Sequence, residues 1–124
     1  MFQTLSLVAL GGALGSAARY MVNVAALRAF GTGFPVATMT VNVAGSFLMG
    51  ALVVVLAQWG GTRMAPFLMT GVLGGFTTFS AYSLDAVTLW DRGQTSLAAT
   101  YVMGSVVLSL TALVLGMATA RGLA

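Results

Sequence analysis

Seven charged residues divide this chain into four long apolar segments. Because a membrane-spanning helix needs about 20 mainly apolar residues, the pattern predicts spans at roughly 4–27, 35–58, 65–90 and 96–120. The stretches between them, FGTGFP, WGGTR and WDRGQT, contain the glycine, proline and polar residues that are typical of turns. We therefore expect an all-α integral membrane protein, with four transmembrane helices in a single domain over residues 1–124.

The composition agrees with a lipid environment. Of 124 residues, 59% are hydrophobic and 6% are charged, and the mean hydropathy is +1.00. Soluble domains carry about 25% charged residues, so a soluble fold is excluded. The chain has no cysteine and no histidine, which excludes disulfides, thiolate nucleophiles and the usual zinc sites, and makes an enzyme the least expected class. We interpret the first segment as a span and not as a signal peptide, because it lacks a charged n-region.

The arginines are almost evenly divided between the two sides of the membrane. Four spans place both termini and the second connector on one side, with Arg63 and Arg121. Arg28 and Arg92 lie on the other side, joined by Arg19 if that side chain reaches outward. A Lys/Arg excess normally marks the cytoplasmic side, and here it is almost absent. This leaves either a weak orientation preference or insertion in both directions with an antiparallel dimer as the product. We favour the dimer, because four short helices enclose little interior.

Polar and small residues recur on one face of the second and fourth expected spans. In the second span, spacings typical of one helical face align Thr38, Asn42, Gly45, Ser46 and Met49. In the fourth span, the residues that recur at every fourth position are Tyr101, Ser105 and Ser109. The amide of Asn42 can either join two helices or offer donors to a ligand. Three aligned hydroxyl groups favour a polar lining over simple packing.

The stretch GVLGGFTTFSAYS, residues 71–83, interrupts the third apolar segment with glycines and hydroxyl-bearing residues. Glycines followed by two β-branched threonines predict a break in the third helix near residues 74–78. Unwound backbone at membrane depth survives only where protein or water satisfies it, and its carbonyl groups can bind a cation. Phe79 and Tyr82 are expected on one face of the resumed helix. Asp85 lies near the end of this span, and we assign it no catalytic role.

Two GxxxG pairs, Gly11 with Gly15 and Gly71 with Gly75, predict close approach between helices. Arg19 follows the first pair and has two interpretations. It either extends to the lipid headgroups or places a positive charge at the mouth of an aqueous cavity.

Together, the blocks GGALGSAARY, TVNVAGSFLMG and GVLGGFTTFSAYS resemble the signature blocks of the CrcB/Fluc family of fluoride channels. The resemblance covers nearly the whole chain. It implies a dual-topology, antiparallel homodimer in the plasma (inner) membrane, with two pores for the passive export of cytoplasmic fluoride. It also implies a structural sodium ion (Na+) at the centre of the dimer, held by backbone carbonyl groups at the two helix breaks.

The resemblance further implies roles for individual residues. Gly74 and Thr77 resemble the sodium-coordinating positions. The residues that match the fluoride pathway are Asn42, Phe79, Ser80, Tyr82, Tyr101, Ser105, Ser109 and Arg19. Tyr82 departs from the family pattern, which usually has phenylalanine at this position. Its ring keeps a positively polarised edge, whereas its hydroxyl group adds a donor that could narrow the pathway or rotate the ring.

Two other functions stay open at this point. A proton-coupled exporter of the small multidrug-resistance type also has four spans and dual topology. It needs a titratable carboxylate deep in the membrane, and Asp85 lies near an end of its span. A non-transporting membrane scaffold would instead use the polar helix faces to contact a partner helix.

Overall fold

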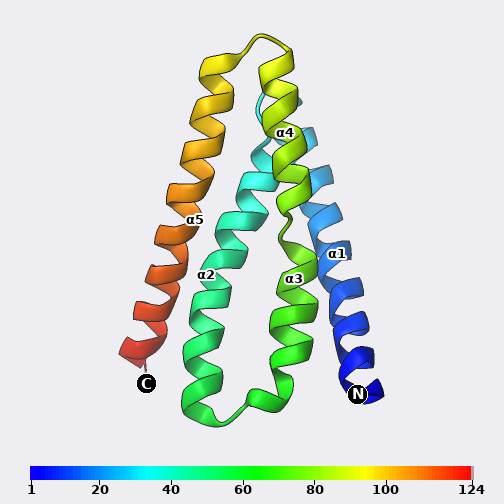
Figure 1. Cartoon of the computed structure of the whole chain (residues 1–124), viewed down its shortest axis with the longest axis vertical. Coiled ribbons are helices and arrows are strands. Elements are labelled where there is room, and N and C mark those ends of the chain that lie inside the picture. The colour runs from blue at the N-terminus through cyan, green and yellow to red at the C-terminus, as the bar shows by residue number, and fades with distance from the viewer. Residues whose placement is uncertain (124) are drawn as a thin grey trace.

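The computed structural model describes residues 1–123, and these form helices that run up and down along one long axis (Figure 1). The first, second and last passages are α1 (Phe2–Phe30), α2 (Val36–Trp59) and α5 (Thr95–Leu123). The third passage consists of four pieces: the 3₁₀ helix η1 (Thr62–Met64), the π-helix η2 (Pro66–Leu73), α3 (Gly74–Phe76) and α4 (Phe79–Asp91). Within residues 1–123, four passages are long and apolar enough to cross a membrane. The prediction of an all-α chain with four such helices is confirmed.

Both ends of the described chain lie at the same end of the bundle, together with the α2–η1 connector (Figure 1). The α1–α2 and α4–α5 connectors lie at the opposite end. The turns after α2 and α4 contain Gly60 and Gly93, whose φ angles are 71° and 79°. Glycine is favoured there because a side chain is strained at positive φ.

Glycines bring the helices into close contact. A Cβ atom at Gly11 would lie 2.9 Å from the Cα atom of Gly71 in η2, and one at Gly15 would overlap the backbone of the same helix. The two GxxxG pairs therefore face each other between α1 and the η2–α3 segment. A methyl group at Gly50 or Gly116 would likewise overlap the backbone of α5 or α2, respectively. These glycines thus allow the helix backbones to approach closely. They set the distance between helices that share few polar contacts.

One cluster of buried hydrophobic residues lies between α4 and α5. Its buried members are Tyr82, Leu89, Ala98 and Tyr101. Many large apolar side chains are instead exposed along the outside of the bundle, for example Leu14 and Leu110. Extensive exposed apolar surface is typical of proteins that contact a membrane or another protein.

Candidate functional site

The third passage leaves the helical conformation at Thr77 and Thr78. Both residues are extended, with φ and ψ angles of −87° and 158° at Thr77 and −154° and 123° at Thr78. The interruption lies within the range expected from the sequence and is visible between α3 and α4 in Figure 1. The π-helix η2 that precedes it was not expected; such segments occur frequently at functional sites.

The two threonines satisfy backbone groups on both sides of this break. The Thr77 hydroxyl group donates to the carbonyl oxygen of Leu73 at 2.9 Å. The Thr78 hydroxyl group accepts a hydrogen bond from the backbone N–H of Ala81 at 3.1 Å, so Thr78 is the N-cap of α4. Threonine is favoured at this position because its side chain can satisfy a free N–H group of the first turn.

Asn42 on α2 holds the break through two hydrogen bonds to one residue. Its Oδ1 atom accepts from the Thr78 N–H group at 2.8 Å, and its Nδ2 atom donates to the Thr78 carbonyl oxygen at 3.0 Å. Asn42 therefore joins two helices, which was one of its two possible roles. Because an amide has two N–H donors, one of them is still available to a ligand.

A cavity of about 320 Å³, the central cavity, lies beside the break and between α2, α4 and α5. Of the residues predicted for the fluoride pathway, those that line it are Asn42, Phe79, Tyr82, Ser105 and Ser109. Thr77 and Thr78 line it as well. Residues that are far apart in the sequence thus meet around one space, and every residue in this lining is uncharged.

Ser105 contributes an unusual polar group to the central cavity. The residue is buried, with 4% of its surface exposed, and its hydroxyl group has no hydrogen-bond partner among the described residues. Serine in a helix often donates to a carbonyl group one turn earlier, and Ser105 does not. A buried hydroxyl group without a partner is costly, so Ser105 is a candidate ligand-binding residue.

The two aromatic residues of the third passage differ in burial. Their ring centroids are 5.5 Å apart, and Phe79 is 77% exposed whereas Tyr82 is 9% exposed. The Tyr82 hydroxyl group donates to the carbonyl oxygen of Val102 on α5 at 2.9 Å. The additional hydroxyl group is therefore occupied by a contact between helices.

The Tyr101 ring packs against the Tyr82 ring, and Tyr101 is not among the residues that line the central cavity. It has no exposed surface, and its ring centroid is 5.3 Å from that of Tyr82. Its hydroxyl group donates to Oδ2 of Asp85 at 3.1 Å. No pattern in the sequence indicated this bond, because it joins two helices across the α4–α5 turn.

Two other predicted pathway residues also lie outside the lining of the central cavity. Arg19 is half-buried and donates from Nε to the carbonyl oxygen of Gly75 at 3.0 Å, so it turns toward the protein at the C-terminal end of α3. This end of a helix carries partial negative charge and favours a cationic group. Ser80 is exposed, with its Oγ atom 3.3 Å from Oγ1 of Thr78. The assignment of all eight predicted residues, including Arg19, Ser80 and Tyr101, to the fluoride pathway stays a prediction.

A metal ion at the break would be bound by backbone oxygens. No group of three or more His, Cys, Asp or Glu residues that could hold a metal occurs in the part of the chain that the structure describes. Among the side-chain hydrogen bonds and the backbone hydrogen bonds of turns and caps in residues 1–123, none is accepted by the carbonyl oxygen of Gly74 or Thr77. Free carbonyl groups beside an unwound segment are a known type of sodium ligand.

Comparison with known proteins assigns the chain to a family. Residues 6–117 match the family described as "CrcB-like protein, Camphor Resistance (CrcB)". The "Fluoride-specific ion channel FluC" of Cereibacter sphaeroides (strain ATCC 17029 / ATH 2.4.9) is 67% identical over 122 residues, which cover 98% of each chain. The protein of the same name from Paracoccus denitrificans (strain Pd 1222) is 58% identical over 123 residues, covering 99% of this chain and 98% of the relative. These relatives are named as channels and not as enzymes. The chain is a multi-pass membrane protein that belongs to the CrcB family.

Proposed function

We propose that this chain forms a fluoride-selective channel for the passive export of cytoplasmic fluoride. The observation that carries the proposal is the buried Ser105 hydroxyl group, which has no partner within residues 1–123 and lines the same cavity as the amide of Asn42. The names of the relatives, fluoride-specific ion channels at up to 67% identity, give independent support.

The chemistry of the central cavity suits a small, strongly hydrated anion. A pore for fluoride has to replace the water around the ion with hydrogen-bond donors. Asn42 has a free amide N–H, Ser105 and Ser109 have hydroxyl groups, and Phe79 and Tyr82 have positively polarised ring edges. A fixed cation in the lining would bind fluoride too tightly, whereas several weak sites in series favour conduction.

Passive flow is sufficient for export. Hydrogen fluoride is a weak acid that diffuses into a cell and dissociates at near-neutral pH, so fluoride accumulates in the cytoplasm. A channel in the plasma membrane lets the anion leave along its electrochemical gradient without coupling to protons. The structure offers no support for a scaffold, because the Ser105 hydroxyl group is buried within this chain and not presented to a partner helix.

The functional unit in this proposal is a dual-topology, antiparallel homodimer. Phe79 lines the central cavity and is nevertheless 77% exposed, and the neighbouring Gly74 and Ser80 are also exposed. A second copy packed against the break would cover this surface and complete the wall of the cavity. The nearly even distribution of arginines between the two sides supports its antiparallel insertion.

A structural sodium ion fits the residues at the centre of such a dimer. Gly74 and Thr77 of each copy would supply free carbonyl oxygens. The C-terminal end of the η2–α3 segment points to the same place and adds partial negative charge. When bound, the cation would reduce the electrostatic cost of an anion in the low-dielectric interior.

Efflux from liposomes tests the proposed function. Purified protein is reconstituted into liposomes that contain fluoride or chloride, and the released anion is measured with an ion-selective electrode. We expect rapid release of fluoride and slow release of chloride. Equal and negligible release of both anions would refute the channel, and drug-stimulated proton uptake would support the exporter instead.

A further inference from the structure

Four aromatic side chains form a continuous row, the aromatic row, from the α1–α2 connector to the central cavity. Its members, in spatial order, are Phe34, Tyr101, Tyr82 and Phe79. The centroids of neighbouring rings are 5.6 Å, 5.3 Å and 5.5 Å apart, within the range of about 4.5–7 Å at which aromatic rings attract one another. Tyr82 and Phe79 line the central cavity, whereas Phe34 and Tyr101 do not. The row therefore connects residues of the cavity wall to a residue outside it.

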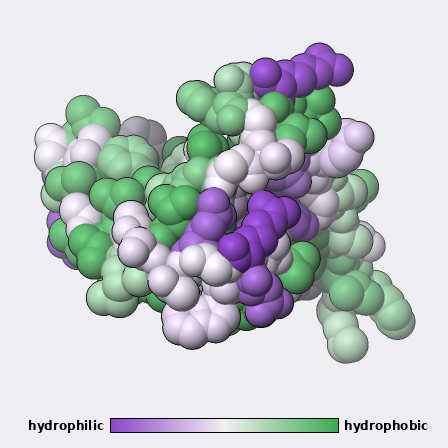
Figure 2. Space-filling model, turned by 90° about the horizontal axis from the view of Figure 1, so that it is seen from above, coloured by the Kyte–Doolittle hydropathy of each residue, from purple (hydrophilic) through white to green (hydrophobic). Residues whose placement is uncertain are grey.

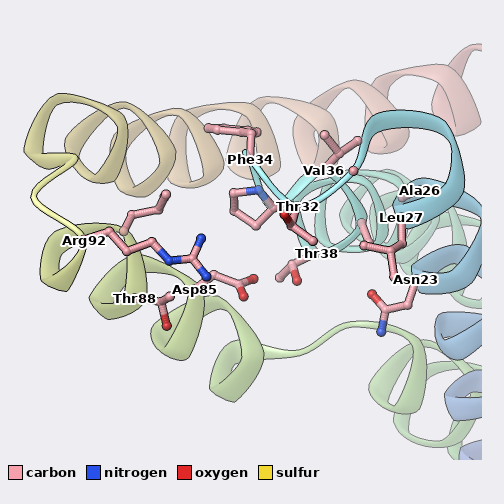
Figure 3. Close-up of a pocket in the computed structure, with 14 residues that line it drawn as sticks. Asn23, Ala26, Leu27, Thr32, Phe34, Val36, Thr38, Asp85, Thr88 and Arg92 are labelled. Carbon is pink, nitrogen blue, oxygen red and sulfur yellow. The ribbon is translucent and has the colours of Figure 1, made fainter.

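Phe34 lies at the end of the bundle that contains the α1–α2 and α4–α5 connectors. Hydrophilic side chains gather near the middle of this end, with hydrophobic ones around them (Figure 2). Phe34 and Asp85 both border a cavity of about 290 Å³ there, Phe34 from the connector and Asp85 from α4 (Figure 3). Because Phe34 borders open space, a smaller side chain at this position does not leave a hole in a closed core.

The backbone around Phe34 is held in a tight turn. Pro35 has φ and ψ angles of −77° and 69°, and the N–H group of Val36 donates to the carbonyl oxygen of Phe34 at 2.8 Å. These values describe an inverse γ-turn centred on Pro35. Since the proline ring also restricts φ, the turn holds Phe34 in a defined position before α2 begins.

The hydrogen bonds of the two tyrosines do not fix the planes of their rings. Tyr101 donates to Oδ2 of Asp85 at 3.1 Å, and Tyr82 donates to the carbonyl oxygen of Val102 at 2.9 Å. The hydroxyl oxygen of a tyrosine lies on the axis about which the ring rotates. A bond to this oxygen therefore fixes the axis and leaves the rotation about χ2 weakly restrained. The contacts between rings have to set the planes.

The ring of Phe34 supplies such a contact. It meets Tyr101 at an interplanar angle of 89°, a T-shaped arrangement, and Tyr101 has no exposed surface. Tyr101 in turn meets Tyr82 at 46°. The plane of the Tyr82 ring matters for an anion, because the edge of an aromatic ring is positively polarised and its face is negative. A turned ring would present its face to the anion and repel it.

We propose that Phe34 is a positioning residue for fluoride conduction, which acts through Tyr101 to keep the edge of the Tyr82 ring toward the central cavity. This inference rests on the proposed fluoride function and adds a residue that does not contact the anion. Phe34 is the one member of the aromatic row that comes from a connector and not from a helix. The connector and the cavity wall are thus mechanically joined.

Ring rotation and fluoride efflux, measured on the same variants, test this role. Phe34→Leu removes the ring and keeps an apolar side chain. Phe30→Leu is the matched control, because Phe30 is 69% exposed near the same connector and lies outside the aromatic row. The chain has three tyrosines, so NMR spectra of protein with ¹³C-labelled tyrosine rings can be assigned ring by ring. Tyr20, which is 68% exposed, is the internal reference.

We expect Phe34→Leu to speed the rotation of the Tyr101 and Tyr82 rings about threefold to tenfold, and to slow fluoride efflux from liposomes about threefold, the range for loss of one aromatic pair. The Tyr20 signals should not change, and Phe30→Leu should match the wild-type protein in both measurements. Phe34→Tyr, measured in efflux alone, keeps the ring and should retain the wild-type rate.

Unchanged rotation of the Tyr82 ring in Phe34→Leu would overturn the inference and leave the channel intact. A lower yield of folded protein, with wild-type efflux for each folded molecule, would show that Phe34 only stabilises the fold and would also overturn it. No fluoride release by the wild-type protein would instead refute the proposed function and the role of Phe34 in conduction. The NMR comparison would then still decide whether Phe34 orients Tyr82.

Discussion

The contact between Asn42 and Thr78 determines how firmly the helix break is held. Asn42→Ala removes two hydrogen bonds, of 2.8 Å and 3.0 Å, and leaves the N–H and carbonyl groups of Thr78 without partners in a half-buried position. A hydrogen bond contributes about 0.5–1.5 kcal/mol net, so the loss of two predicts local destabilisation of about 2 kcal/mol. This free energy corresponds to about 30-fold more frequent opening of the break.

Hydrogen–deuterium exchange measures this opening directly. The exchange rate of the Thr78 amide is compared in wild-type protein, Asn42→Ala and Gln58→Ala, all in the same detergent. Gln58 is exposed near the end of α2 and serves as a control for loss of a polar side chain on that helix. We expect about 30-fold faster exchange at Thr78 in Asn42→Ala and no change in Gln58→Ala. Unchanged exchange at Thr78 in Asn42→Ala would show that the amide does not hold the break.

Three further substitutions probe the packing around the site. Gly15→Val forces its side chain into the backbone of the third passage, and it should destabilise the folded state by about 1–3 kcal/mol in detergent unfolding experiments. Thr78→Val removes the hydroxyl acceptor for the Ala81 N–H group and should cost about 1 kcal/mol in the same assay, with faster exchange in the first turn of α4. Tyr82→Phe loses the bond to Val102 and should reduce stability by about 1 kcal/mol. Because the ring remains, this variant should keep the preference for fluoride over chloride in liposome efflux.

The features that were predictable from the sequence have local causes. Long uncharged segments are sufficient to indicate helices that cross a membrane, and the glycine–threonine sequence is sufficient to place a break within a few residues. The π-helix Pro66–Leu73 was not predictable, because it depends on how the third passage fits against α1. Intrinsic propensities carry little information about such a local change in helical winding.

The contacts between residues of the site were harder to predict from the sequence. A polar stripe on α5 shows that Tyr101 and Ser105 share a face, but not that one hydroxyl group is bonded and the other is free. The position of Arg19 was ambiguous because its partner, the carbonyl group of Gly75, comes from a distant part of the chain. In each case the deciding contact is tertiary, and no spacing within one helix encodes it.

The most direct measurement for the proposed channel is fluoride efflux through wild-type protein and Ser105→Ala, with the unfolding free energy of both determined in parallel. The Ser105 hydroxyl group has no hydrogen-bond partner within residues 1–123, so its removal should leave stability unchanged or slightly higher. In the proposed channel, the Ser105 hydroxyl group donates a hydrogen bond to the passing anion, so its loss should slow fluoride efflux about 10-fold to 100-fold. This factor corresponds to the loss of one hydrogen bond to a charged group. If Ser105→Ala has unchanged stability and the wild-type rate of fluoride efflux, this result would contradict the proposal that the Ser105 hydroxyl group donates to the passing anion.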